Sequence, residues 1–289
     1  MRQQRVVGAN LATSGESTGT DSSIKRERRA LGLGRSAWAS TACRVAAITV
    51  IGLTAMYVLG GAREDGAPSR ARKMTADPCA VALTAQSGSS PMDADIQGLQ
   101  QRIRKAKDRR VKLERLGWLF VAKARVSNDP GYYNLAAQTA ACLSETDPGS
   151  AAARLLRGHV LHNQHRFQEA EVVARELVAT RKSPFDYGLL GDVLMEQGRL
   201  EEAADAYQTM VDLKPGLQSY SRAAHLRWLK GDLPGAIELM GMAARAGGPR
   251  NAEAVAWAYS RLAIYELQAG ASGPALRASV PEEILARLV

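Results

Sequence analysis

The chain has few of the residues that build disulfide-rich or multi-site metal proteins. Its 289 residues include three cysteines and four histidines, and aromatic residues make up 5%. Apolar residues reach 46% and charged residues 23%. A chain with this much apolar material can bury a sizeable core, which excludes both a small disulfide-stapled domain and a mostly disordered protein. The length allows one or two domains.

Motifs of the common enzyme classes are also missing. The sequence has no glycine-rich phosphate loop, no Gly-x-Ser-x-Gly elbow and no His-Glu-x-x-His zinc motif. His159, His162 and His165 are spaced three apart, but His165 falls at an expected turn and no cysteine or carboxylate completes a set of three convergent ligands. We therefore expect no enzymatic activity, no cofactor and no metal.

Positive charge is concentrated in two places. The net charge is +9, and residues 1–75 hold 12 Lys or Arg against 5 Asp or Glu. Because this excess flanks an apolar run, it indicates membrane topology rather than nucleic-acid binding. The second concentration, from Arg102 to Arg125, is either a solvated helix face or a surface for anionic lipid or an acidic partner.

The N-terminal third predicts a membrane anchor. Residues 1–36 have the composition of a disordered basic tail. Residues 37–62 predict a single transmembrane helix, because Val45–Ala62 is uncharged and would span about 27 Å as a helix. The positive-inside rule then places the N-terminus in the cytoplasm and the rest in the periplasm or at the cell surface. Residues 63–92 are rich in small residues and predict a flexible linker.

Two points about this region stay open in the sequence. The apolar run could instead be a signal sequence cleaved near Ala62, which would leave a secreted or periplasmic soluble protein. Cys79 and Cys142 could oxidise together if this part of the chain lies outside the cytoplasm, although a pair of free thiols is the simpler expectation.

Residues 93–289 predict helices arranged as repeats. Apolar residues recur three and four positions apart, with glycine and proline between the segments. The clearest unit has Tyr187, Leu190, Gly191 and Leu194, followed by Gly198, Ala203, Tyr207 and Pro215. Ala170, Ala203 and Ala236 are each 33 residues apart, and Gly158 precedes Gly191 by the same interval.

This pattern resembles the tetratricopeptide repeat (TPR), a helix–turn–helix unit of about 34 residues. The resemblance covers roughly residues 109–280 and implies an all-α, right-handed α-α superhelix with about four full repeats and one partial repeat. One unit has His165 where the turn glycine is expected, and the first has about seven extra residues, placed in its inter-helix loop around 127–131. Asp95 to Lys107 predicts an amphipathic capping helix, with Ile96, Leu99 and Ile103 on one face.

In this family the first helix of each repeat (helix A) lines a concave face that holds a peptide or a partner helix. Two positions of helix A then predict seven residues in the groove: Trp118, His159, His162, Asp192, Met195, His225 and Trp228. Trp118 and Trp228 would be anchors, and His159, Asp192 and His225 would supply hydrogen bonds. The alternative is that the tryptophans pack between repeats and the histidines are merely solvated.

The function predicted from the sequence is a non-enzymatic scaffold or adaptor for a protein or peptide partner at a bacterial envelope, with no nucleic-acid partner. A second possibility is self-association. The partial last repeat would leave apolar surface of its helix A uncovered at Trp257, Leu262 and Ile264, and another copy could stack there.

Overall fold

The computed structural model describes residues 76–248, 251–271, 273, 280–282 and 286. The predicted tail, the predicted transmembrane helix and the first part of the predicted linker lie outside the described residues. Across the part of the chain that the structure describes, no helix combines the length and the apolar character needed to cross a membrane.

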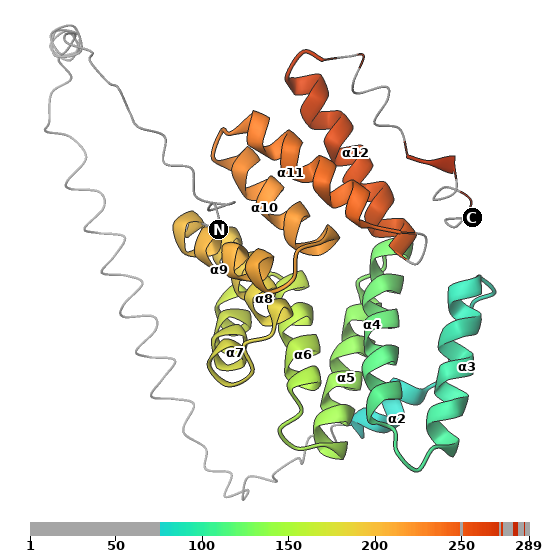
Figure 1. The fold of residues 1–289 in the computed structure, drawn as a ribbon. Coiled ribbons are helices and arrows are strands. Elements are labelled where there is room, and N and C mark those ends of the chain that lie inside the picture. Colours follow the sequence, from blue (N-terminus) through green and yellow to red (C-terminus); the bar gives the residue numbers. More distant parts are fainter. Residues whose placement is uncertain (1–75, 249–250, 272, 274–279, 283–285, 287–289) are drawn as a thin grey trace, which may run out of the picture. The chain divides into compact units, whose positions relative to one another are not determined.

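The described residues form eleven helices and no strand, which confirms the predicted all-α class (Figure 1). Their bounds are α2 Pro78–Leu83, α3 Pro91–Lys105, α4 Arg110–Ser127, α5 Gly131–Thr146, α6 Ala151–Asn163, α7 Phe167–Thr180, α8 Pro184–Glu196, α9 Leu200–Leu213, α10 Leu217–Leu229, α11 Leu233–Ala246 and α12 Ala252–Gln268.

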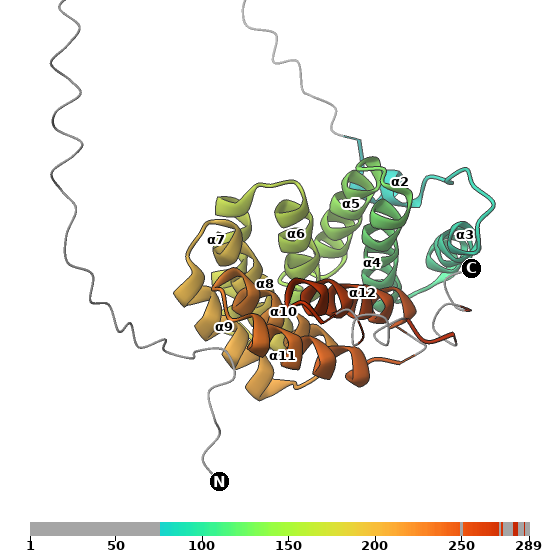
Figure 2. The ribbon, with the colours of Figure 1, turned by 90° about the horizontal axis from the view of Figure 1, so that it is seen from above.

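Helices α4 to α11 form four antiparallel hairpins, α4–α5, α6–α7, α8–α9 and α10–α11, and α12 is the first helix of a fifth unit. Each hairpin packs mainly on the next one along the chain, and successive A helices (α4, α6, α8, α10 and α12) also contact one another. The hairpins follow a curve that brings α12 back beside α4 (Figures 1 and 2). This is the stacked helical solenoid that the repeat pattern predicts.

Small residues let the helices of neighbouring elements approach closely. A Cβ atom at Gly191 would lie 2.3 Å from the Tyr207 ring, and one at Gly158 would lie 2.4 Å from Leu189 Cδ2. Both distances are far inside van der Waals contact, so a side chain at either position would force the helices apart. The repeat spacing of small residues therefore reflects packing.

The turns between paired helices share one backbone conformation. Gly198 and Gly231 have φ angles of 76° and 81°. His165 occupies the equivalent place and has a φ angle of 58°. The turn therefore keeps its left-handed conformation although histidine replaces glycine. This conformation is strained for a residue with a side chain.

The A helices differ in length, and this corrects one expectation. α6, α8 and α10 have 13 residues each, whereas α4 has 18 and α12 has 17. Five of the extra residues of the first repeat extend α4 at its C-terminal end, up to Asn128 with a φ angle of 53°, and two extend α5 at its start, so the loop itself is not lengthened.

Two helices precede the first hairpin. α3 buries Ile96, Leu99 and Ile103, as the amphipathic pattern predicts. α2 lies within residues 63–92, the range predicted as a flexible linker, so the ordered body begins earlier than predicted. α2 packs on α5, and the Gln100 side chain of α3 donates hydrogen bonds to two carbonyl groups at the end of α2.

A disulfide between Cys79 and Cys142 joins α2 to α5. The two Cα atoms are 4.7 Å apart, within the usual range for a disulfide. The expectation of two free thiols is therefore not met, and the alternative that the sequence left open is the one observed. The bridge fixes the N-terminal end of the solenoid to its first repeat.

Candidate functional site

Two adjoining cavities lie among the A helices, with volumes of about 380 and 530 Å³. They share five lining residues from α4, α10 and α12, namely Arg125, Ser221, Arg222, Ala254 and Trp257. We call them together the concave site. Their volumes lie in the range of ordinary ligand pockets.

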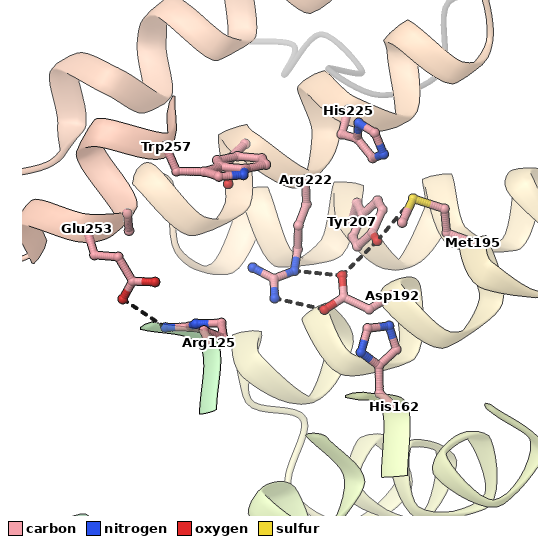
Figure 3. Close-up of a pocket in the computed structure, with 11 residues that line it drawn as sticks. Arg125, His162, Asp192, Met195, Tyr207, Arg222, His225, Glu253 and Trp257 are labelled. Atoms are coloured by element: carbon pink, nitrogen blue, oxygen red, sulfur yellow. Dashed lines mark hydrogen bonds and ion pairs between the residues drawn. The ribbon is translucent and has the colours of Figure 1, made fainter. Parts of the chain in front are cut away.

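A buried charge network forms the floor of the first cavity (Figure 3). Asp192 of α8 accepts hydrogen bonds from Arg222 Nε and Nη2 of α10, both at 2.8 Å. It also accepts a hydrogen bond of 2.8 Å from the hydroxyl of Tyr207 on α9. One carboxylate thus joins three helices of two repeats, and its oxygens are committed to internal partners.

The pairing decides the ionisation of this network. Burial alone would raise the pKa of Asp192, but the charge and hydrogen bonds of Arg222 outweigh it and lower that pKa. Burial, together with the Asp192 charge, raises the pKa of Tyr207 well above its usual value. At neutral pH the floor is therefore an ion pair with a neutral phenol, and it presents no net charge to an occupant.

Three histidines surround the network. Burial lowers the pKa of His159 to about 4 and also lowers the pKa of His225, so both rings are neutral at pH 7. His162 Nε2 is buried and has no hydrogen-bond partner among the described residues. Because His162 lines the first cavity, its ring offers a free hydrogen bond to an occupant.

Three large aromatic side chains contribute to the wall of the second cavity. It is lined by Trp118 of α4, Phe185 of α8 and Trp257 of α12. The Trp118 ring meets the His159 ring edge to face, with centroids 5.0 Å apart. Trp257 remains 44% exposed, which leaves much of its surface available for contact.

The ends of the curved row of A helices meet at the concave site. Arg125 Nη2 of α4 lies 3.1 Å from Glu253 Oε2 of α12 (Figure 3). Both residues lie in the extra turns that make α4 and α12 longer than the helices between them. The two long helices therefore touch across the opening of the site through an exposed ion pair.

Six of the seven predicted groove residues line the concave site. His162, Asp192, Met195 and His225 line the first cavity, and Trp118 and His159 line the second.

The seventh predicted residue, Trp228, lines neither cavity. Its ring stacks between those of His225 and Tyr265, and its indole N–H donates a 2.7 Å hydrogen bond to Gln268. This geometry favours the alternative in which Trp228 packs between repeats.

Several lining residues were not predicted. Arg222 and Trp257 lie on other positions of helix A, and Arg125 and Glu253 belong to the extended ends of α4 and α12. The sequence offers one signal, which is the acidic residue Asp192 on an otherwise apolar stretch of helix. A buried carboxylate needs a cationic partner.

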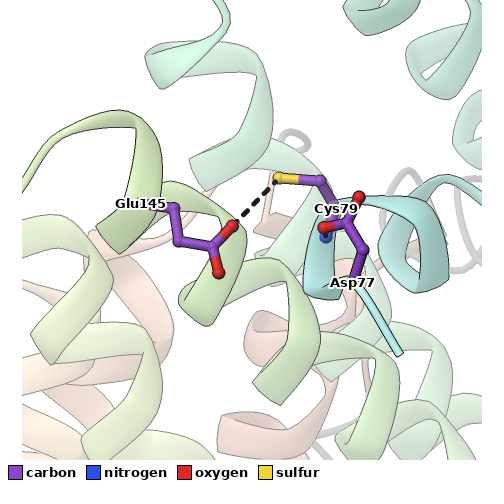
Figure 4. Close-up of side chains that lie close together, drawn as sticks. All are labelled: Asp77, Cys79 and Glu145. Carbon is purple, nitrogen blue, oxygen red and sulfur yellow. Dashed lines mark hydrogen bonds between the residues drawn. The ribbon is translucent and has the colours of Figure 1, made fainter. Parts of the chain in front are cut away.

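A second cluster of polar groups contains Asp77, Cys79 and Glu145 (Figure 4). Their ligand atoms lie within 4.8 Å of one another, and Cys79 Sγ is 3.9 Å from Glu145 Oε2. The sulfur is bonded to Cys142, so it offers neither a thiolate to a metal nor a proton to the carboxylate. Two exposed carboxylates remain, which is too few ligands for a structural metal site.

Comparison with known proteins shows likeness in fold only. No protein-family model and no curated protein matches the sequence. A solved structure of the APC/C hetero-tetramer Cut9-Hcn1 matches 68% of this chain and 37% of its own, with 14% identity and a TM-score of 0.50. A TPR protein from Thermus thermophilus matches 58% of this chain and 87% of its own, with 18% identity and a TM-score of 0.49.

A structure of MamA matches 57% of this chain and 92% of its own, with 18% identity and a TM-score of 0.41. The described residues have the fold of a stacked helical solenoid, in agreement with the repeat pattern.

Proposed function

We propose that the protein is a non-enzymatic interaction module that holds a short segment of a partner protein in the concave site. The observation that carries this proposal is the pairing of aromatic walls with a preorganised, internally neutral floor. The Asp192–Arg222–Tyr207 network is already assembled, so an occupant meets a fixed floor and orders few side chains.

The size of the site limits the occupant. Because α4 and α12 meet at Arg125 and Glu253, the site is a cup and not an open channel along the solenoid. Its volume accommodates a few side chains. We therefore expect a turn or a helix end that inserts one or two apolar side chains between Trp118 and Trp257 and bonds to His162 Nε2.

We further propose that the body lies outside the cytoplasm, held by the predicted span of residues 37–62. Disulfides persist in oxidising compartments and are rare in the cytosol, so the Cys79–Cys142 bridge supports this location. Protease added to spheroplasts should digest the body, and the undigested membrane-bound chain should have its full mass. Protection from the protease would contradict the topology. A mature chain that starts near residue 63 would contradict the anchor.

The concave site can be tested by photo-crosslinking in cells. A photoreactive amino acid at Ser221 or Trp257 should give discrete adducts with another protein. The same amino acid at Val172, which is exposed on the helix-B side of the second repeat, is the control. Adducts of equal yield and identity from all three positions would contradict a specific concave site.

Self-association is a second candidate function, favoured by the exposed end of the solenoid. Ile264 and Leu267 of α12 are 41% and 58% exposed, whereas Leu262, which the sequence suggested as part of this surface, is buried. Light scattering at several concentrations tests the candidate. A mass that rises with concentration and falls to that of the monomer in Ile264→Asp would support stacking of copies.

A further inference from the structure

A separate cavity of about 340 Å³ lies between α5, α6 and the start of α7. Its floor consists of small and apolar side chains, including Ala137, Ala140, Ala141 and Ala153. Three arginines, Arg154, Arg157 and Arg166, stand at its walls.

This cavity faces away from the concave site. Arg157 precedes His159 by two residues on α6, which corresponds to about 200° around the helix axis. Arg154 and Arg157 are three residues apart, so they lie on the same face. Because His159 lines the concave site, the arginine cavity occupies the other side of α6.

Two of the three guanidinium groups form no ion pair with any residue that the structure describes. Arg166 is engaged, since its Nε and Nη2 each donate a 2.7 Å hydrogen bond to Glu169. No ion pair of Arg154 or Arg157 occurs within the described residues, although the charge of Arg157 acts on the Glu169 carboxylate at longer range. Arg154 Nε is buried and has no hydrogen-bond partner among those residues. A buried unpaired donor on a cation is costly, so the site is suited to an anion.

We propose that this cavity binds a phosphate monoester carried on a small apolar group, either free or as a lipid headgroup. Two guanidinium groups without an ion pair match the two negative charges of the monoester, and Arg presents the fork of donors that phosphate oxygens accept. The alanine floor leaves room for the apolar group beside the phosphate. This proposal is independent of the function of the concave site.

Calorimetric titration of the full-length protein in a non-ionic detergent tests the proposal with phenyl phosphate as probe. We expect saturable binding that weakens as salt is added. Arg157→Gln, at an exposed side chain, should weaken binding about tenfold. Arg110→Gln removes the same charge from an exposed arginine outside the cavity and should leave binding unchanged. Inorganic phosphate and benzyl alcohol should each bind more weakly than phenyl phosphate.

Absence of saturable binding, or equal losses in Arg157→Gln and Arg110→Gln, would overturn the proposal, because the second result reports net charge and not a site. Arg154→Gln is a second variant, accepted only if its melting temperature matches that of the parent.

Vesicles of phosphatidylcholine with and without phosphatidic acid distinguish the two sources. Binding to phosphatidic acid that depends on Arg157 and not on Arg110 identifies the lipid headgroup. Binding of phenyl phosphate without such vesicle binding identifies a free ester.

Discussion

Asp192 shows how single residues set the character of the concave site. Its carboxylate would be expensive to bury alone, and Arg222 and Tyr207 satisfy it from two other helices. The same three side chains hold the third and fourth repeats together. Stability and preorganisation of the site therefore depend on the same contacts.

Asp192→Asn should lower the free energy of unfolding by about 2 kcal/mol, because it leaves the guanidinium of Arg222 without its counter-charge. Tyr207→Phe should lower it by about 1 kcal/mol, since the hydrogen bond to Asp192 is lost together with only a long 3.8 Å contact to Met195 Sδ. Urea denaturation measures both changes. In the double variant Asp192→Asn/Arg222→Met, part of the loss should return. If the double variant loses as much stability as Asp192→Asn and Arg222→Met lose in sum, the two side chains do not act as a coupled pair.

His159 predicts a pH dependence of stability. Its pKa is about 4 in the folded protein, against 6.5 as the ordinary value. The unfolded chain therefore binds more protons between these values, so stability is complete above pH 6.5 and falls as the pH drops toward 4. The loss amounts to at most about 3 kcal/mol.

Urea denaturation at pH 7, 6 and 5 measures this effect. His159→Asn should reduce the pH dependence of the unfolding free energy. A smaller dependence should remain, because the pKa of His225 is also lowered. An unchanged slope in the variant would mean that other groups cause the pH dependence.

Gly198 and Gly98 give opposite predictions for the same substitution. Gly198 has a φ angle of 76° and open space around the site of a Cβ, so Gly198→Ala should destabilise the protein by about 1 kcal/mol through backbone strain alone. Gly98 is inside α3, where alanine is the better helix former, so Gly98→Ala should stabilise by up to about 1 kcal/mol. Thermal melts of both variants check the signs, and a loss of stability in both would point to packing instead.

At the scale of elements, helix length decides whether the site is open or closed. The three central A helices have equal lengths, and the two outer ones carry extra turns at the ends that face each other. Arg125 and Glu253 lie in these extra turns. A solenoid of five equal A helices with the same curvature would lack this contact.

Arg125→Glu should separate α4 from α12, since two carboxylates would then face each other. Spectroscopic labels at Val126 and Ile264, both exposed, should report a longer or broader distance distribution. The charge-swapped pair Arg125→Glu/Glu253→Arg should restore the original distribution. Unfolding free energies should change by less than about 1 kcal/mol, because the ion pair is exposed. A distribution that Arg125→Glu does not alter would mean that packing alone sets the closure.

Helices that are determined by the sequence within one repeat could be predicted from the sequence. The 33-residue phase of Ala170, Ala203 and Ala236 identifies the hairpins, because each repeat packs by the same rule. The extension of α4 was missed, since the segment before Asn128 suits a helix or a loop. The Arg125–Glu253 pair spans 128 residues, and its formation depends on the curvature of the whole stack, which no local pattern contains.

The same distinction between features set within one repeat and features set by the packing of repeats applies to the candidate site. The helix-A phase identified His159, His162 and Asp192 because it reports which way a side chain points. It could not identify the Arg222 partner, which depends on the offset between neighbouring repeats. Trp228 has the predicted phase and is nevertheless covered by the rings of His225 and Tyr265.

At the scale of the whole body, contacts between neighbours dominate, so a local defect should stay local. Cys142→Ser should remove about 2–4 kcal/mol of stability from the N-terminal end, since the disulfide closes a long loop. Hydrogen exchange should accelerate in α2 to α5 and remain nearly unchanged in α8 to α11. Uniform acceleration across the body would indicate that the solenoid unfolds as one unit.

The disulfide also determines how the body bears mechanical load. A pull on the chain ahead of Cys79 passes through the sulfur bridge into α5 at Cys142, a jump of 63 positions along the sequence. Helices α3 and α4 lie inside the covalent loop that the bridge closes, so the pulling force is not transmitted through them. The lining residues Trp118 and Arg125, both on α4, would therefore keep their positions under traction that would unravel an unbridged first repeat.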